Sequence, residues 1–180
     1  MKKLTLETER LILRPFTMDD VDGVLEFSSN PETQKYTGDV TRTTKAEVED
    51  IIQNVWFSDY KKYGYGRFAV VHKKDDKIIG FSGIKYLPEM DATDLGYRFL
   101  PQYWGKGIAT ESCVPILKYA FQMHNLNKVI AFVEPENPAS SAVLKKLGFS
   151  YKKSAPYPGE EDQGAVEWYT LTKKAYNERQ

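Results

Sequence analysis

The fold is decided by the stretch Gly96–Glu111, which reads GYRFLPQYWGKGIATE. Its apolar and aromatic start predicts a strand, and the residues after Gly107 take up helical spacing. A glycine-rich turn therefore joins the end of a strand to the start of a helix. The first backbone N–H groups of a helix have no partner within it, and glycine lets a ligand approach the backbone closely. With the helix dipole, this arrangement predicts an anion site suited to a pyrophosphate.

Other interpretations of this turn compete on spacing alone. A Rossmann fingerprint requires a third glycine, where this sequence has Thr110, and a βαβ unit near the N-terminus, whereas the turn lies in mid-chain. A P-loop requires GxxxxGK followed by Ser or Thr, an order that the sequence lacks. The remaining alternative is a helix start whose glycines only form a tight turn. Spacing leaves that alternative and the anion site open.

The flanking segments predict one α+β domain over residues 1–180, built around a mixed, mostly antiparallel sheet. Strands are expected at 4–16, 67–72, 77–87, 93–100, 128–133, 149–153 and 166–172. Helices are expected after a capping box at 17–20, over 45–62, from Gly107 with a kink at Pro115, and over 138–147. The segments Asn30–Pro31 and 154–164 are predicted to be a helix stop and a loop. The domain then has about seven strands and about four helices.

Composition narrows the class of protein. Of the 180 residues, 41% are hydrophobic and 28% are charged, which is typical of a soluble globular domain. The 25 basic and 25 acidic residues cancel, so a bulk attraction to nucleic acid is not indicated. The one cysteine, Cys113, excludes an intramolecular disulfide and a cysteine-based metal site and fits a reducing cytoplasm. Neither a signal peptide nor a membrane span is expected.

A second informative stretch, Glu134–Phe149, reads EPENPASSAVLKKLGF. Asn137 is a good N-cap, Pro138 suits the first turn and Gly148 is a good helix stop. On the residues alone, Ser140 merely occupies the first turn, and local capping accounts for the pattern.

Taken together, the two stretches resemble the signature blocks of the GCN5-related N-acetyltransferase superfamily. Gln102–Gly107 resembles its pyrophosphate-binding pattern Q/R-x-x-G-x-G/A. The second block, N-x-x-S…K-x-G-F, is matched by Asn137, Ser140, Lys146, Gly148 and Phe149. The form GYxxxPxxWGxGxATE resembles the ribosomal-protein acetyltransferase branch, the RimJ/RimL type, as do Thr8–Arg14, Asn30–Glu32 and Glu167–Thr172. The resemblance covers nearly the whole chain and is specific for fold and cofactor, but weak for the acceptor.

The resemblance implies acetyl-CoA as co-substrate, no metal, and two central parallel strands that splay apart to admit the cofactor. Backbone groups of the first strand would meet pantetheine, amides of the turn would hold the pyrophosphate, and the second block would form the far wall. The implied contacts, in that order, are Tyr97, Arg98, Phe99 and Leu100; Trp104, Gly105, Lys106, Gly107, Ile108, Ala109 and Thr110; and Asn137 and Ser140.

One departure from the family pattern affects the chemistry. Many relatives carry a proton-donating tyrosine seven residues after the block's asparagine, where this chain has Leu144. The ribosomal-protein branch often offers a serine instead, so Ser140, or a water it holds, is the candidate donor to the leaving thiolate. Asp94 is the candidate base, acting through water, and a solvated strand-end carboxylate is the alternative. Cys113 lies on an apolar helix face, so an inert thiol and direct transfer in a ternary complex are expected.

The expected acceptor is a primary amine, with a protein N-terminal α-amino group as the leading hypothesis. A small amine such as an aminoglycoside, polyamine or amino acid is the alternative, and Leu144 keeps open a module that binds acyl-CoA without catalysis. The run Glu160–Asp162 would attract a cationic acceptor or is simply a solvated loop. Four aromatic residues either line the acceptor pocket or belong to the core: Tyr36, Trp56, Tyr63 and Tyr65. The histidines, His72 and His124, lack the spacing of metal ligands. No nucleic acid or membrane partner is expected, and a homodimer stays open.

Overall fold

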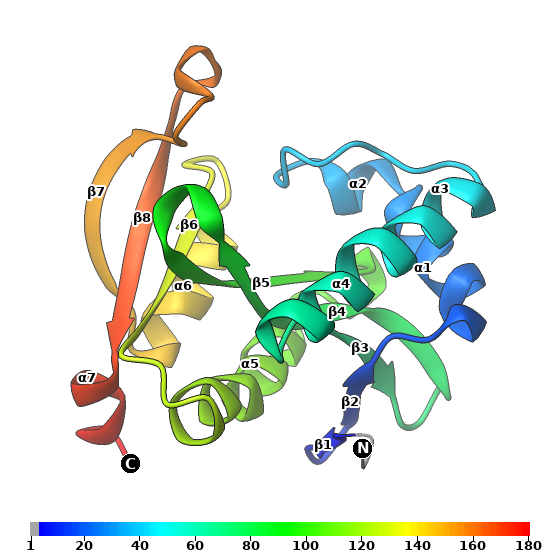
Figure 1. The fold of residues 1–180 in the computed structure, drawn as a ribbon, viewed down its shortest axis with the longest axis horizontal. Coiled ribbons are helices and arrows are strands. Elements are labelled where there is room, and N and C mark those ends of the chain that lie inside the picture. Colours follow the sequence, from blue (N-terminus) through cyan, green and yellow to red (C-terminus); the bar gives the residue numbers. More distant parts are fainter. Residues whose placement is uncertain (1–3) are drawn as a thin grey trace.

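The computed structural model describes residues 4–180, which form one eight-stranded mixed sheet with helices on both faces (Figure 1). The strand order is β1-β2-β3-β4-β5-β6-β8-β7. Strands β5 and β6 pair in parallel, and the other neighbours pair antiparallel. The strands are β1 (Leu6–Glu7), β2 (Leu11–Pro15), β3 (Arg67–His72), β4 (Lys77–Leu87), β5 (Ala92–Phe99), β6 (Lys128–Val133), β7 (Ser150–Pro156) and β8 (Ala165–Thr172).

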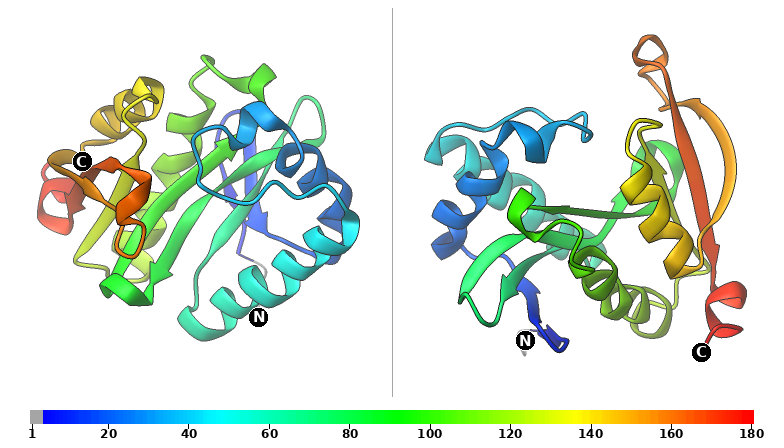
Figure 2. Two further views of the ribbon diagram at one scale, coloured as in Figure 1. Left: turned by 90° about the horizontal axis from the view of Figure 1, so that it is seen from above. Right: turned by 180° about the vertical axis from the view of Figure 1, so that it is seen from behind.

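The helices divide between the two faces of the sheet (Figure 2). They are α1 (Val21–Ser28), α2 (Pro31–Gln34), α3 (Lys45–Asp50), α4 (Phe57–Tyr63), α5 (Ile108–Lys118), α6 (Pro138–Leu147) and α7 (Lys173–Asn177). The π-helical segment η2 (Ile51–Trp56) joins α3 to α4, and η5 (Tyr119–Met123) continues α5. One buried cluster joins α1, α3 and η2 to the sheet, and a larger cluster joins α5 and α6 to it. No helix of the described chain is long and apolar enough to cross a membrane.

Most of the predicted elements are confirmed. Strands 67–72, 77–87 and 128–133 and helix 138–147 have the predicted bounds. The capping box at the start of α3 is also present, because the side chain of Glu47 accepts from the backbone N–H of Thr44 while Thr44 Oγ1 accepts from the N–H of Glu47. Pro115 lies inside α5, and the kink there stays a prediction.

Four predictions of elements need correction. The opening strand is two strands, because Thr8 and Leu11 exchange hydrogen bonds across a turn. The Asn30–Pro31 segment also begins a helix, since the Asn30 side chain accepts from the N–H groups of Glu32 and Thr33. Strand β7 extends to Pro156 into the predicted loop, and α7 was not predicted.

The feature that positions the site is the short contact between β5 and β6. The two strands pair only at Asp94 and Ile130. Beyond this pair they diverge, and β6 turns its other edge to β8 over its whole length. The predicted splayed central strands are therefore present, and they open a gap between the end of β5 and the start of α6 (Figure 1).

Candidate active site

The gap between β5 and β6 opens into a cleft of about 1000 Å³. The cleft is lined on one side of the sheet by the glycine turn and the start of α6, and on the other by α1, α2 and the loop that follows. Most of the residues predicted for the site line it: Asp94, Tyr97, Arg98, Phe99, Trp104, Gly105, Gly107, Ile108, Ala109, Thr110, Asn137 and Ser140. Leu100 and Lys106 are not among the lining residues.

The glycine turn presents unpaired amides to the cleft. Gly105 and Gly107 have φ of 69° and 78°, in the left-handed region that favours glycine. Gly107 is the N-cap of α5, and it offers no side chain to accept from the first turn. Within residues 4–180, the amides of Ile108, Ala109 and Thr110 have no acceptor, while the next amide bonds to the Gly107 carbonyl. This geometry suits the pyrophosphate of a nucleotide cofactor.

The first turn of α5 is held to the N-terminal segment by Glu111. Its carboxylate accepts from Thr8 Oγ1 at 2.6 Å, from Arg10 N at 2.9 Å and from Arg10 Nε at 2.7 Å. Burial alone would raise the pKa of Glu111, but these hydrogen bonds hold that pKa below its usual value. The motif residues Thr8, Arg10 and Glu111 thus form one clamp, whose parts lie far apart in the sequence.

The edge of β5 that faces the gap exposes the backbone groups of alternate residues. The N–H of Leu100 donates to Ile79 on β4, and the Trp104 indole N–H donates to the Phe99 carbonyl at 2.7 Å. Because successive residues of a strand turn their backbone groups to opposite edges, those of Tyr97 and Phe99 face the gap and those of Arg98 face β4. Of the four predicted pantetheine contacts on β5, this orientation favours Tyr97 and the N–H of Phe99, because the Phe99 carbonyl already accepts from Trp104.

The far wall is the start of α6. The Asn137 side chain caps the helix by accepting from Ser140 N at 3.2 Å, and its Nδ2 donates to Ser140 Oγ at 3.1 Å. Across the gap, the Tyr97 hydroxyl donates to the Ser140 carbonyl at 3.3 Å. Burial raises the pKa of Tyr97. Sequence reasoning assigned Tyr97 only a backbone role and missed this hydroxyl. Leu144 is buried and lines the cleft.

Asp94 is a buried carboxylate, not the solvated strand end that was the alternative. It is 5% exposed, and its Oδ2 lies 2.7 Å from Arg67 Nη2. Burial raises the pKa of Asp94, and the charge of Arg67 opposes that rise. Sequence reasoning missed Arg67, because nothing in its strand marks it as the partner of a residue on β5.

The aromatic residues considered for the acceptor divide into two pairs. Tyr36 and Trp56 line the cleft. Tyr63 and Tyr65 lie outside it: the rings of Tyr63 and Tyr86 have centroids 4.8 Å apart, and the Tyr65 hydroxyl lies 2.7 Å from Thr93 Oγ1. Packing therefore accounts for that second pair.

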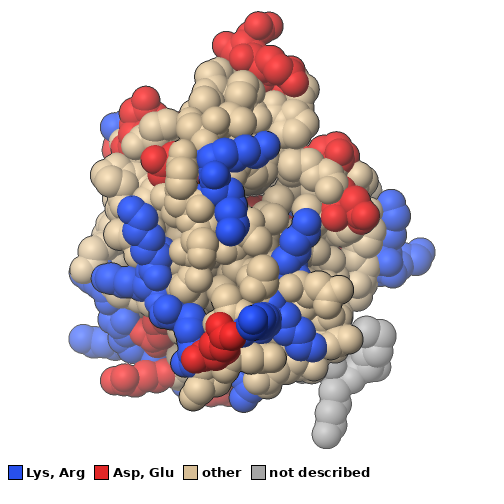
Figure 3. All heavy atoms as spheres, turned by 90° about the vertical axis from the view of Figure 1, so that its left-hand side faces the viewer, with Lys and Arg blue, Asp and Glu red and all other residues tan. Residues whose placement is uncertain are grey.

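The remaining charged groups considered from the sequence are the acidic run and the two histidines. Acidic side chains gather at the top of the molecule, at the tip of the β7–β8 connection (Figure 3). His72 contacts Asp75 at 2.8 Å, and His124 packs against Tyr65 and Tyr119. In the part of the chain that the structure describes, no cluster of side chains is arranged to hold a metal ion.

A model of the acetyltransferase (GNAT) domain matches residues 10–150. The chain belongs to the GNAT acetyltransferase family. It is 33% identical to the uncharacterized N-acetyltransferase p20 of Bacillus licheniformis over 96% of this chain and 98% of that relative. It is 27% identical to the spermidine N(1)-acetyltransferase of Escherichia coli K12 over 77% and 72% of the two chains.

Solved structures agree with this assignment. A GNAT-family acetyltransferase from Bacillus anthracis is 26% identical, with a TM-score of 0.78 over 95% of this chain and 99% of that one. A putative ribosomal-protein-serine acetyltransferase from Vibrio cholerae is 22% identical, with a TM-score of 0.75 over 94% and 97%, and shares the fold. This GNAT protein is therefore an N-acetyltransferase, from a family that uses acetyl-CoA.

Proposed function

We propose that this GNAT enzyme transfers the acetyl group of acetyl-CoA directly to a primary amine, either the α-amino group of a protein N-terminus or an amine of a small molecule. The sequence motifs of the ribosomal-protein branch favour the N-terminus. Relatives named as a spermidine N(1)-acetyltransferase and an FsC-acetyl coenzyme A-N(2)-transacetylase favour a small amine. The single reduced cysteine supports a cytoplasmic location.

The observation that carries the proposal is that free amides and a free strand edge open into one cleft. The amides of Ile108–Thr110 and the turn before them would hold the pyrophosphate. The backbone edge at Tyr97 and Phe99 would hold the pantetheine arm, with Asn137 and Ser140 opposite. Both glycines of the turn have positive φ, a conformation that L-residues rarely adopt, so the turn that presents these amides depends on glycine at both positions.

The chemistry follows from what the residues around the gap can do. A free amine attacks the thioester carbon, and the charge that develops on the carbonyl oxygen is stabilised by a backbone N–H at the free edge of β5. Asp94 accepts the amine's proton through a water, since burial has raised its pKa toward that of a base that works near neutral pH. Ser140 Oγ, or a water that it holds, protonates the leaving thiolate.

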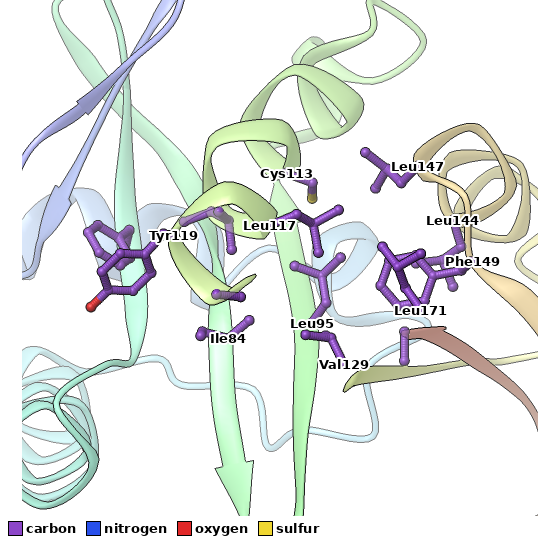
Figure 4. Packing of buried hydrophobic residues seen from close by; sticks show 14 of the residues in the cluster. Ile84, Leu95, Cys113, Leu117, Tyr119, Val129, Leu144, Leu147, Phe149 and Leu171 are labelled. Carbon is purple, nitrogen blue, oxygen red and sulfur yellow. The ribbon is translucent and has the colours of Figure 1, made fainter. Parts of the chain in front are cut away.

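A covalent acetyl-enzyme is not needed on this route. Cys113 projects into the packed layer between α5 and the sheet (Figure 4). Burial raises the pKa of its thiol to about 11, and its nearest polar neighbour is Ser82 Oγ at 3.5 Å. A thiol in such surroundings is a poor nucleophile at neutral pH.

Initial-rate kinetics with acetyl-CoA and a panel of amines and short peptides test the proposal. We expect turnover with at least one primary amine and intersecting double-reciprocal lines, as direct transfer in a ternary complex requires. Parallel lines would show a ping-pong mechanism and contradict it. CoA binding without turnover of any amine would favour the non-catalytic module.

A further inference from the structure

The half of the cleft opposite α5 contains a cluster of buried charges that acetyl-CoA binding does not explain. Along β5, the side chains of Leu95 and Phe99 pack with α5 in the larger core cluster. Alternation turns Asp94 and Arg98 to the other face, where Phe81 packs with α1 and η2. The acceptor has to reach the thioester from this side, because the proposed cofactor site occupies the other.

Arg98 is the member of this cluster whose hydrogen bonds are least satisfied. Its side chain lines the cleft and is 8% exposed. Its Nη2 donates to Asp39, and the guanidinium lies 5.3 Å from the Phe81 ring centroid. Its Nε is buried and has no hydrogen-bond partner among residues 4–180. A buried N–H without an acceptor costs free energy, so a ligand that supplies one is favoured.

Two further arginines lie close to Arg98 on this side of the cleft. Arg67 also lies over the Phe81 ring, and its guanidinium donates hydrogen bonds to Asp94 and to the Gly83 carbonyl. Burial lowers the pKa of Arg98, and so do Arg67 and Arg42, which indicates that cationic groups lie close to it. Its one carboxylate neighbour, Asp39, has a side chain that is 52% exposed and lies on the loop after α2.

The opposite wall of the cleft is acidic. Glu134, Glu136 and Glu160 line it, and Lys146 of α6 is the basic residue among them. Burial raises the pKa of Glu134, and the charges of its two acidic neighbours add to that rise. A cleft with cationic and anionic walls is complementary to a ligand that carries both charges.

We propose that Arg98 binds a carboxylate of the acceptor, so that the substrate is a small amine of the amino-acid type. The planar guanidinium recognises a carboxylate through two parallel hydrogen bonds, which a lysine in its place cannot reproduce. Arg98 Nη2 donates to Asp39 in this structure, and the incoming carboxylate would take the place of Asp39. This inference rests on the proposed acetyl transfer and specifies its substrate.

Acceptors in matched pairs test the inference: each free amino acid is compared with its carboxamide, and a peptide that begins with the same residue forms a third arm. The measured quantity is the ratio of kcat/KM for the carboxylate and the carboxamide. We expect Arg98→Gln to lower this ratio by roughly tenfold or more, since a charge-assisted bidentate pair is lost. Arg98→Lys should restore it only in part.

Asp39→Asn changes an exposed position and should act in the opposite direction. Removing the competing carboxylate should raise the ratio, whereas a purely structural Arg98–Asp39 pair would make both variants affect both acceptors alike. Lys45→Gln, which breaks the exposed pair with Asp22, is the matched control and should leave the ratio unchanged. An unchanged ratio in both cleft variants, or a preference for the carboxamide or the peptide in the wild type, would overturn the inference.

Failure of the proposed function gives a different result. If no amine is turned over, acetyl transfer is refuted, and calorimetry on the CoA-saturated protein then decides the inference. Tighter binding of the amino acid than of its carboxamide, weakened in Arg98→Gln, would support a carboxylate site. Equal binding of the two would overturn it.

Discussion

The two halves of the cleft differ in the groups that face it: backbone groups in one half and charged side chains in the other. On the cofactor side, the groups that face the cleft are mainly backbone: the amides of the glycine turn and the free edge of β5. On the proposed acceptor side they are charged side chains: the buried pair Arg67–Asp94, and buried Arg98 with the exposed Asp39. A backbone site suits one common ligand and tolerates change in side chains. A side-chain site can be altered by single substitutions, so we propose that acceptor choice resides there.

The largest effect is expected where the cofactor half depends on backbone conformation. Gly107→Val should abolish CoA binding, because a β-branched residue at this φ costs about 1–3 kcal/mol and moves the first amides of α5. Isothermal titration calorimetry measures the loss. The matched control is Gly159→Val, at a φ of 84° and with open space around a built Cβ. It should be strained in the same way yet keep CoA affinity. Equal losses in the two variants would show that CoA binding does not depend on the conformation of the glycine turn.

At the boundary of the halves, Ser140→Ala should lower kcat by about tenfold or more while KM for acetyl-CoA changes little, if the hydroxyl or its water protonates the thiolate. Steady-state kinetics with a saturating acceptor check this. The Asn137 side chain would still cap α6 through Ser140 N, so stability should be almost unchanged. A rise in KM with kcat constant would make the serine a binding residue only.

Asn137→Ala should act on both the fold and the cofactor half. The loss of the α6 cap should cost about 1 kcal/mol of unfolding free energy. The KM for acetyl-CoA should rise as well, since the side chain also orients Ser140. Thr44→Ala removes the cap of α3, away from the cleft, and should lower stability without changing KM. Asn137 is only a cap if its variant behaves like that control.

A smaller effect is expected from the clamp that holds the glycine turn. The folded pKa of Glu111 lies below its ordinary value, so the stability it contributes is present above about pH 4.3 and is lost as the pH falls through the folded pKa. Glu111→Gln should therefore lower the melting temperature at pH 7 and match the wild type at strongly acidic pH. Glu26→Gln, which breaks an exposed pair with Lys77, should change it little at either pH. A Glu111→Gln deficit that persists unchanged in acid would show that the charge is not what stabilises the clamp.

Cys113→Ala should have the least effect on turnover. The thiol is fully buried, and its raised pKa of about 11 predicts slow reaction with iodoacetamide at pH 8 in the folded protein. Some packing stability is lost, because the smaller side chain leaves a void. Mass spectrometry after incubation with acetyl-CoA alone should find no acetylated Cys113, and finding it would contradict direct transfer.

The same contrast explains what the sequence could predict. The glycine turn, the Asn137 cap and the Gly148 stop are local patterns, so the elements they bound followed from the residues. The place of the glycine turn and of Asn137 at the cofactor cleft came from the family resemblance. Local signals also misled: Asn30 caps the next helix as well as ending the one before it. The sheet register of β5 and β6, and with it the length of the splay, depends on long-range pairing that no local pattern records.

Side-chain partners across the fold were beyond sequence reasoning for the same reason. Arg67 and Asp94 lie 27 residues apart in the sequence and are brought together by the register between strands. Thr8 and Glu111 lie 103 residues apart in the sequence. The family motif implies only a backbone contact for Arg98, so the sequence predicted no role for its side chain. A count of unpaired buried donors, which requires coordinates, is what marks Arg98.

The division of the cleft is tested most directly by a crystal structure of the complex with CoA and a slow or unreactive amino-acid acceptor. We expect the pyrophosphate on the amides of Ile108–Thr110, the thiol in the gap beyond Asp94, and the acceptor on the Phe81 side of the sheet with its carboxylate on Arg98. Phosphates bound away from the glycine turn, or an acceptor and CoA on the same side of the sheet, would contradict it.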